Sequence, residues 1–141
     1  MLTAARADRY LTVAGGRLLL QAGVPLVLSS DHPCGAVDPR HNLRAAVQRQ
    51  LGRPGPDGDG KRLQSQLQPE QALTPSEAVR AATVTAAASL QAPGASGLAP
   101  GEIADFVICD GDPFHNDTRV VQTWIGGMPV WQKENEKGVP L

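Results

Sequence analysis

A short polar segment follows an apolar run near the start of the chain. The stretch "LVLSSDHP", residues 26–33, places Ser29, Ser30, Asp31 and His32 directly after the apolar run 24–28. A continuous apolar run of this length is typical of a strand covered on both faces, as in a parallel sheet. Groups just beyond the carboxyl ends of such strands form the active sites of α/β barrels and open sheets. A carboxylate at this position can bind a divalent ion or take a proton from water.

The same residues also have ordinary structural uses. Serine and aspartate are common in turns, so the residue types alone leave a loop cap and a catalytic acid both open for Asp31. His32 points away from Asp31 if the strand continues, because adjacent strand side chains face opposite sides. Ser30 and His32 are therefore candidates for supporting the carboxylate or lining a substrate pocket. Cys34 has no base assigned to it and is a poor candidate for a thiol nucleophile.

Composition excludes several classes of protein. The chain has 141 residues, 13 basic and 14 acidic side chains and a formal charge of -1, so it offers no strong field for nucleic acid or an acidic membrane. Its apolar stretches are shorter than the roughly 20 residues of a membrane-spanning helix. The two cysteines, Cys34 and Cys109, are far apart and form no metal-binding or disulfide pattern. We therefore expect a cytoplasmic protein whose length suits a single domain with a hydrophobic core.

Helical and loop signals alternate through residues 1–93. The pattern predicts the end of a helix at Gln21, the buried strand 24–28 and a helix over 42–51. Residues 52–62 are rich in glycine and proline and predict a flexible loop. Its D-x-D beginning is not a calcium loop, because Arg62 and Gln68 stand where a glycine and a carboxylate are required. Thr74-Pro75-Ser76-Glu77 is a capping box that begins a helix running through Ser89.

The pattern changes to strands from residue 94 onward. Pro100-Gly101 suits the centre of a type II turn, and strands are predicted over 104–109 and 120–125. Gly126-Gly127 predicts a two-residue hairpin turn into a return strand, 128–131, where Pro129 indicates a sheet edge. Residues 94–132 thus form the strand region, and the polar tail 133–141 follows it.

Three segments together resemble the C-terminal part of an amidohydrolase-superfamily enzyme, most closely the YtcJ-like, or amidohydrolase 3, branch of metal-dependent hydrolases. They are "QAGVPLVLSSDHP", "ALTPSEAVRAATVTAAASL" and "SGLAPGEIADFVICDGDP" with the following "VVQTWIGGMPVW". The resemblance implies an α/β fold in which residues 1–93 are the C-terminal part of a barrel, with its last strand and closing helices. Residues 94–132 would then be strands of a small composite β-sandwich beside it.

The resemblance also implies a chemistry. In this family the aspartate that ends the last barrel strand, here Asp31, is a metal ligand and proton shuttle. The reaction is hydrolysis of C–N bonds other than peptide bonds, with one or two divalent ions, commonly zinc, activating water for attack on a small-molecule substrate. The family's H-x-H pair, its carboxylated lysine or glutamate and its later histidines have no counterpart here. Catalytic zinc needs about three protein ligands, so we expect no tight zinc binding by this chain alone.

Three hypotheses follow from the resemblance and its gaps. The chain is a C-terminal portion of a hydrolase, inactive until the missing barrel is supplied; or it is a non-catalytic remnant that serves as a folding or association module. The third and weakest is a small independent enzyme using Asp31, His32 and Cys34. A single barrel strand and half a sandwich leave open strand edges and apolar faces, so we expect a homo-oligomer or a marginally stable chain.

Overall fold

The computed structural model describes residues 15–30, 32–33, 37–49, 68–92, 94 and 97–133. The chain divides into two compact units, Met1–Ala82 and Thr83–Leu141, which are described separately below. Asp31, Cys34, the predicted loop 52–62 and all but the first residue of the predicted tail lie outside the described residues. Within the described part, no helix combines the length and the apolar character needed to cross a bilayer.

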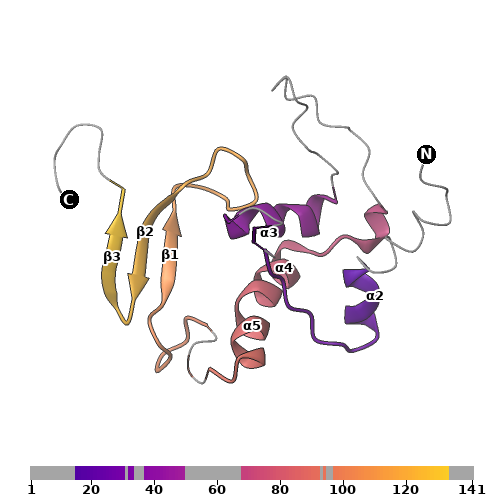
Figure 1. Ribbon diagram of the computed structural model, residues 1–141, viewed down its shortest axis with the longest axis horizontal. Coiled ribbons are helices and arrows are strands. Elements are labelled where there is room, and N and C mark those ends of the chain that lie inside the picture. The colour runs from indigo at the N-terminus through magenta and orange to yellow at the C-terminus, as the bar shows by residue number, and fades with distance from the viewer. Residues whose placement is uncertain are drawn as a thin grey trace. The chain divides into compact units, whose positions relative to one another are not determined.

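The described part of the first unit contains short helices (Figure 1). They are α2 (Gly16–Gln21), α3 (Pro39–Gln48), the three-ten helix η1 (Pro69–Gln71) and α4 (Pro75–Ala82). Helix α3 begins three residues earlier than predicted, because Asp38 accepts a hydrogen bond from the Arg40 N–H at 3.0 Å and Pro39 occupies the first helical position. It ends at Arg49, which adopts the left-handed conformation at φ 51°.

The predicted buried strand over 24–28 is wrong for this structure. These residues form no strand, and Val24 and Val27 are 44% and 42% exposed. The Leu28 N–H donates to the Ala81 carbonyl at 3.2 Å, which attaches this segment to α4. A parallel strand forms only when neighbouring strands complete its ladder, and the described residues of the first unit contain no strand. The apolar run therefore has a sequence typical of a strand, but the described residues of the first unit offer no neighbouring strand with which it could pair.

The capping box at the start of α4 is confirmed, but the predicted helix is interrupted. The Thr74 N–H donates to Glu77 Oε2 at 2.7 Å, and the Glu77 N–H donates to Thr74 Oγ1 at 3.3 Å. Instead of continuing to Ser89, α4 ends at Ala82 and α5 (Val84–Ser89) follows in the second unit. Thr83 breaks the helix at φ −122°, ψ −85°. It opens a run of three β-branched residues, 83–85, which favour helix weakly.

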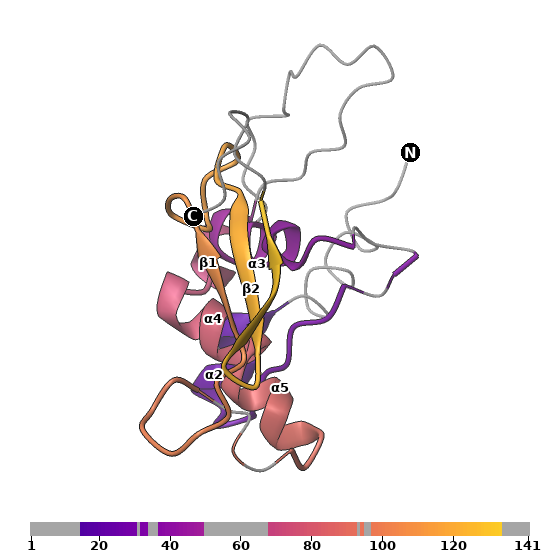
Figure 2. The same ribbon diagram turned by 90° about the vertical axis from the view of Figure 1, so that its left-hand side faces the viewer.

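The second unit contains a three-stranded antiparallel sheet. Its strands are β1 (Phe106–Cys109), β2 (Val120–Ile125) and β3 (Met128–Gln132), and Figures 1 and 2 show β2 between the other two. The predicted hairpin is confirmed, since Gly126 and Gly127 have φ of 57° and 75°, the positive values that a type I′ turn requires. Pro129 lies on the edge strand β3, where its missing N–H is tolerated.

Few apolar side chains are fully covered. Among the described residues, the buried apolar side chains are Leu73, Ala78 and Ala81, all in the first unit. On the sheet, Phe106 stacks on Trp124 with ring centroids 5.5 Å apart, whereas every residue of β3 is exposed. Large apolar side chains stay exposed in the described parts of both units, such as Leu18 at 54% in the first unit and Leu98 at 74% in the second.

Candidate functional site

The sequence placed the candidate site around Asp31, which lies outside the described residues. Of its two predicted neighbours, Ser30 is half-buried and His32 is exposed. The Ser30 Oγ accepts a hydrogen bond from the His32 backbone N–H at 3.4 Å, a contact typical of a serine turn. The roles of Asp31 as catalytic acid and metal ligand, and of Ser30 and His32 beside it, stay predictions.

An ion pair attaches α2 to the start of α4. Arg17 donates from Nη1 to Glu77 Oε1 and from Nη2 to Glu77 Oε2, both at 2.6 Å, the paired geometry that carboxylates accept best. Its Nε and Nη2 also donate to the Ala72 carbonyl at 3.2 and 2.9 Å. The sequence revealed the helix-capping role of Glu77. It carried no signal for Arg17, because a partner 60 residues away follows no local spacing rule.

The same partners change the acidity of Glu77. Hydrogen bonds from Arg17, followed by those from the backbone and hydroxyl of Thr74, lower the pKa of Glu77 to about 2. The same pairing has the opposite effect on its cationic partner, because the hydrogen bond to Glu77 raises the pKa of Arg17. In α3, Arg40 lowers the pKa of Asp38 to about 2 by a similar pairing. These carboxylates are thus ionised throughout the neutral range and act as structural anchors.

The pH dependence of stability should reveal the Glu77 pair. A depressed carboxyl pKa stabilises the folded state above the ordinary value of 4.5, and this contribution is lost as the pH falls towards about 2. Glu77→Gln should therefore be less stable than the wild type at pH 7, and the difference should shrink between pH 4.5 and pH 2.5, as measured by urea unfolding. Glu70→Gln, at an exposed position of η1, is the matched control and should show no such change. A Glu77→Gln difference that is constant with pH would contradict the role of its charge.

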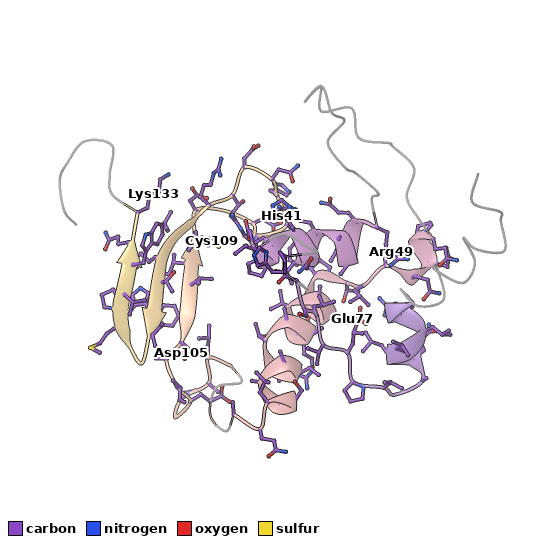
Figure 3. All side chains as sticks on the ribbon, viewed as in Figure 1. His41, Arg49, Glu77, Asp105, Cys109 and Lys133 are labelled. Carbon is purple, nitrogen blue, oxygen red and sulfur yellow. The ribbon has the colours of Figure 1, made fainter. Side chains whose placement is uncertain are left out.

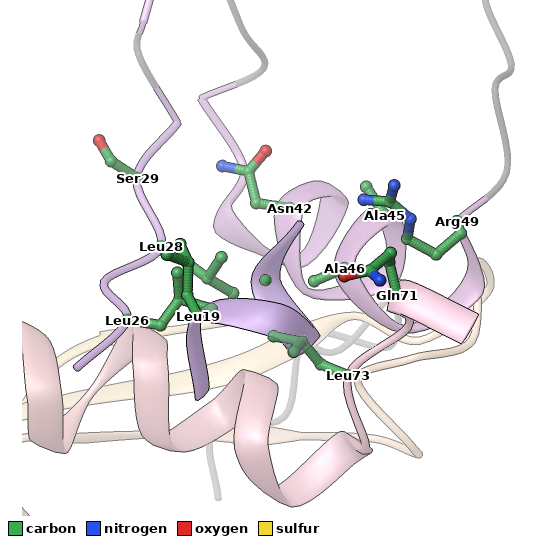
Figure 4. A pocket seen from close by; sticks show the side chains of 11 residues that line it. Leu19, Leu26, Leu28, Ser29, Asn42, Ala45, Ala46, Arg49, Gln71 and Leu73 are labelled. Atoms are coloured by element: carbon green, nitrogen blue, oxygen red, sulfur yellow. The ribbon is translucent and has the colours of Figure 1, made fainter. Parts of the chain in front are cut away.

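A pocket lies beside the segment that leads to Asp31. It has a volume of about 310 Å³ and is lined by residues of α2, α3 and η1 and of the segments 26–29 and 73. In Figure 4, Leu19, Leu26 and Leu28 gather on one side, while Arg49 and Gln71 lie on the other. The polar residues Ser29 and Asn42 complete the lining. Ser29 is two positions before Asp31 in the sequence, and of the described residues in the polar segment 29–32 it is the one that lines the pocket.

The described residues do not form a metal centre. No three His, Cys, Asp or Glu side chains among them are close enough to hold an ion. Asp105 and Cys109 lie at opposite ends of β1 (Figure 3), and Asp105 Oδ1 accepts from the Gly126 N–H at 2.7 Å. Asp110 and Asp112 likewise accept from the N–H groups of Arg119 and Phe114, as turn residues do. A divalent metal of the kind the resemblance implies therefore does not fit the described part alone.

Comparison with known proteins decides the family. The model of the amidohydrolase family matches residues 4–131, almost the whole chain. The chain belongs to the amidohydrolase family. The family resemblance predicted from the three sequence segments is thereby confirmed. The matched range covers most of both units, and of the described helices and strands only the last residue of β3, Gln132, lies beyond it.

The chain is also similar to a curated relative in sequence and to a solved structure in fold. The chain is 30% identical over 133 residues to an N-substituted formamide deformylase from Arthrobacter pascens, covering 89% of this chain and 23% of that enzyme. Its fold matches the crystal structure of an amidohydrolase from Thermotoga maritima MSB8 with a TM-score of 0.61 at 21% identity, covering 87% of this chain and 26% of that one. The chain thus spans about a quarter of the length of each relative.

Proposed function

We propose that this amidohydrolase chain is the C-terminal portion of an enzyme that hydrolyses C–N bonds of the amide type. The observation that carries the proposal is the 30% identity to an N-substituted formamide deformylase over 89% of the chain. In such a reaction the C–N bond breaks, the carbonyl carbon gains the oxygen of water and the nitrogen gains a proton. An N-substituted formamide would yield formate and an amine.

The geometry supports a role for α4 in placing the candidate acid. Glu77 and Ala81 are four residues apart and therefore lie on one face of α4. Glu77 holds Arg17 at the start of α2, and the Ala81 carbonyl holds the Leu28 N–H, three residues before Asp31. One helix face thus anchors both ends of the segment 17–28. On this proposal, the segment corresponds by its place in the sequence to the part of the enzyme that leads to Asp31.

The metal ligands other than Asp31 would come from outside this chain. The described residues hold no cluster that fits an ion, and a catalytic zinc needs about three protein ligands. A bound zinc would supply the activation of water, and Asp31 would contribute a carboxylate that binds the ion or carries a proton. We therefore expect the chain alone to bind no zinc tightly and to hydrolyse no amide.

A chimera tests this proposal directly. Residues 4–131 would replace the matching segment of the Arthrobacter pascens deformylase, and formate release from an N-substituted formamide would be measured. We expect a folded, active chimera, and no formate from the 141-residue chain assayed with added zinc. A folded chimera that carries the parent's metal content but releases no formate would contradict the proposal.

The alternative, a non-catalytic association module, has an observation in its favour. The five residues of β3 are all exposed, and Met128 and Trp131 are 67% and 49% exposed. An open apolar edge strand of this kind favours association with another sheet. Sedimentation of the chain as an oligomer, together with an inactive chimera, would favour this alternative; an active chimera would argue against it.

A further inference from the structure

We propose that the open edge of β1 (the β1 edge) binds an extended segment of a partner protein that carries two basic residues five positions apart. The inference is independent of the proposed function, because it uses only residues of the second unit and no step of C–N hydrolysis. A strand at the edge of a sheet leaves N–H and C=O groups that can pair with a further strand. β1 is such a strand, since the sheet has the order β1-β2-β3 (Figure 1).

Two backbone hydrogen bonds show which residues of β1 face β2. Before the strand, the Ala104 C=O accepts from the Gly127 N–H at 3.0 Å. After the strand, the Asp110 N–H donates to the Arg119 C=O at 3.0 Å. Backbone groups alternate between the two sides of an antiparallel strand. The even-numbered residues of β1 therefore face β2, and the odd-numbered residues face the other side.

The N–H and C=O groups of Val107 and Cys109 thus point to the β1 edge. In the described part of the chain no strand lies on that side of β1, and Val107 is 56% exposed. The other edge strand, β3, is less suited to backbone pairing. It contains Pro129, which has no N–H to donate, and its own pairing with β2 is irregular between Thr123 and Trp124. β1 contains neither a proline nor a charged residue, so it is the edge that can best accept a strand.

Negative charges flank the β1 edge. Asp105 precedes β1 and Asp110 follows it. Asp105 Oδ1 accepts from the Gly126 N–H at 2.7 Å. Asp110 Oδ1 accepts from the Arg119 N–H at 2.6 Å. These donors are backbone groups without net charge, so they leave the negative charge of each carboxylate uncompensated. None of the ion pairs found among the described residues includes either aspartate.

The flanking charges select the partner. Asp105 and Asp110 are five positions apart, so their side chains leave the strand on opposite faces. Two basic residues with the same spacing on an antiparallel partner strand would each lie opposite one of them. Opposite charges in such cross-strand pairs are stabilising, and like charges are destabilising. A second copy of this chain would bring two further aspartates to the same edge, so charge favours a basic segment over self-association.

Between its basic residues the partner needs side chains that suit β1. Phe106 stacks on Trp124, and aromatic side chains pair well with β-branched residues across strands. Ile108 is 40% exposed and lies on the same face as Phe106. The peptide Lys-Thr-Val-Thr-Val-Lys meets these requirements. In antiparallel register its lysines lie opposite the two aspartates, its valines opposite Phe106 and Ile108, and its threonines opposite Val107 and Cys109.

The test is a titration of the 141-residue chain with this peptide, capped at both ends and followed by amide chemical shifts. We expect the shifts to concentrate on residues 105–110. The matched control Glu-Thr-Val-Thr-Val-Glu should bind at least about 5-fold more weakly at low salt. The difference should shrink at high salt, because exposed charge pairs are screened. Equal binding of the two peptides at low salt, or shifts confined to residues outside 105–110, would overturn the proposal.

Methylation of peptide nitrogens separates strand pairing from charge attraction. Methyl groups on both threonine nitrogens remove the N–H groups that would donate to the carbonyls of Val107 and Cys109. This peptide should therefore bind at least about 5-fold more weakly than its parent. Methyl groups on both valine nitrogens face away from β1 and should leave binding nearly unchanged. Equal losses in the two methylated peptides would contradict backbone pairing at the β1 edge.

Protein variants test the role of the two carboxylates. Asp105→Asn together with Asp110→Asn keeps both hydrogen-bond acceptors and removes both charges, so the preference for the basic peptide should fall below about 2-fold. Glu70→Gln, at an exposed position of the first unit, is the control and should preserve the preference. Without peptide, the Val107 and Cys109 amides should exchange at a rate independent of protein concentration. Protection that rises with concentration would place a second copy on the β1 edge and overturn the proposal.

Discussion

Replacing Asp31 with asparagine in the deformylase chimera should lower kcat for formate release by about 1,000-fold. Asparagine has nearly the shape of aspartate. Its neutral amide, however, neither accepts a proton from water nor offers a negative charge to a metal. A positioned acid or base contributes on the order of 10²- to 10⁴-fold to rate, so this loss fits the role that the family resemblance implies for Asp31. The measurement is kcat for formate release, with metal content determined by elemental analysis.

The control for this prediction is Asp117→Asn, an exposed aspartate of the second unit. It should leave kcat and metal content unchanged. If Asp31 is only a loop cap, the interpretation that the residue types also allow, Asp31→Asn should leave stability nearly unchanged, because asparagine caps about as well as aspartate, and kcat should stay within a factor of a few. That result would remove Asp31 from the chemistry without affecting the assignment of the chain to the amidohydrolase family.

Leu73→Ala should lower the free energy of unfolding of the chain by about 3 kcal/mol. Leu73 is 5% exposed, the most buried large apolar side chain among the described residues. The Leu73 side chain packs closely against Gly16: a Cβ added at Gly16 would lie 3.4 Å from Leu73 Cδ2. The Leu73 N–H donates to the Ala46 carbonyl at 3.0 Å. It therefore joins α2, α3 and the start of α4, and truncating it would enlarge the neighbouring pocket instead of letting the wall collapse.

Urea unfolding measures this effect against a matched leucine. Leu90 is 79% exposed, so Leu90→Ala should change the free energy of unfolding by less than about 0.5 kcal/mol. A small effect of Leu73→Ala, equal to that of Leu90→Ala, would mean that the first unit has no cooperative core around Leu73. Because so few side chains are buried, a large effect would leave the variant close to unfolded in water.

Locally determined features were predicted well from the sequence. The capping box at Thr74 and Glu77 uses groups three residues apart, and the hairpin at Gly126-Gly127 uses backbone angles that glycine adopts easily. The turn at Pro100-Gly101 is also confirmed, since Gly101 has φ of 94° and the Glu102 N–H donates to the Ala99 carbonyl at 3.1 Å. Each depends on interactions within a few residues, which the order of residues specifies directly.

The sequence alone also determined the family, because three segments in a fixed order carry the amidohydrolase resemblance that the family match over residues 4–131 confirms. The tertiary structure decided what those segments form in this chain. The strand sequence at 24–28 stays coil attached to α4, the pairing of Arg17 with Glu77 joins residues 60 positions apart, and leucines from separate segments line one side of a pocket. A strand ladder, an ion pair and a cavity all depend on which distant segments meet, and local sequence patterns do not encode that.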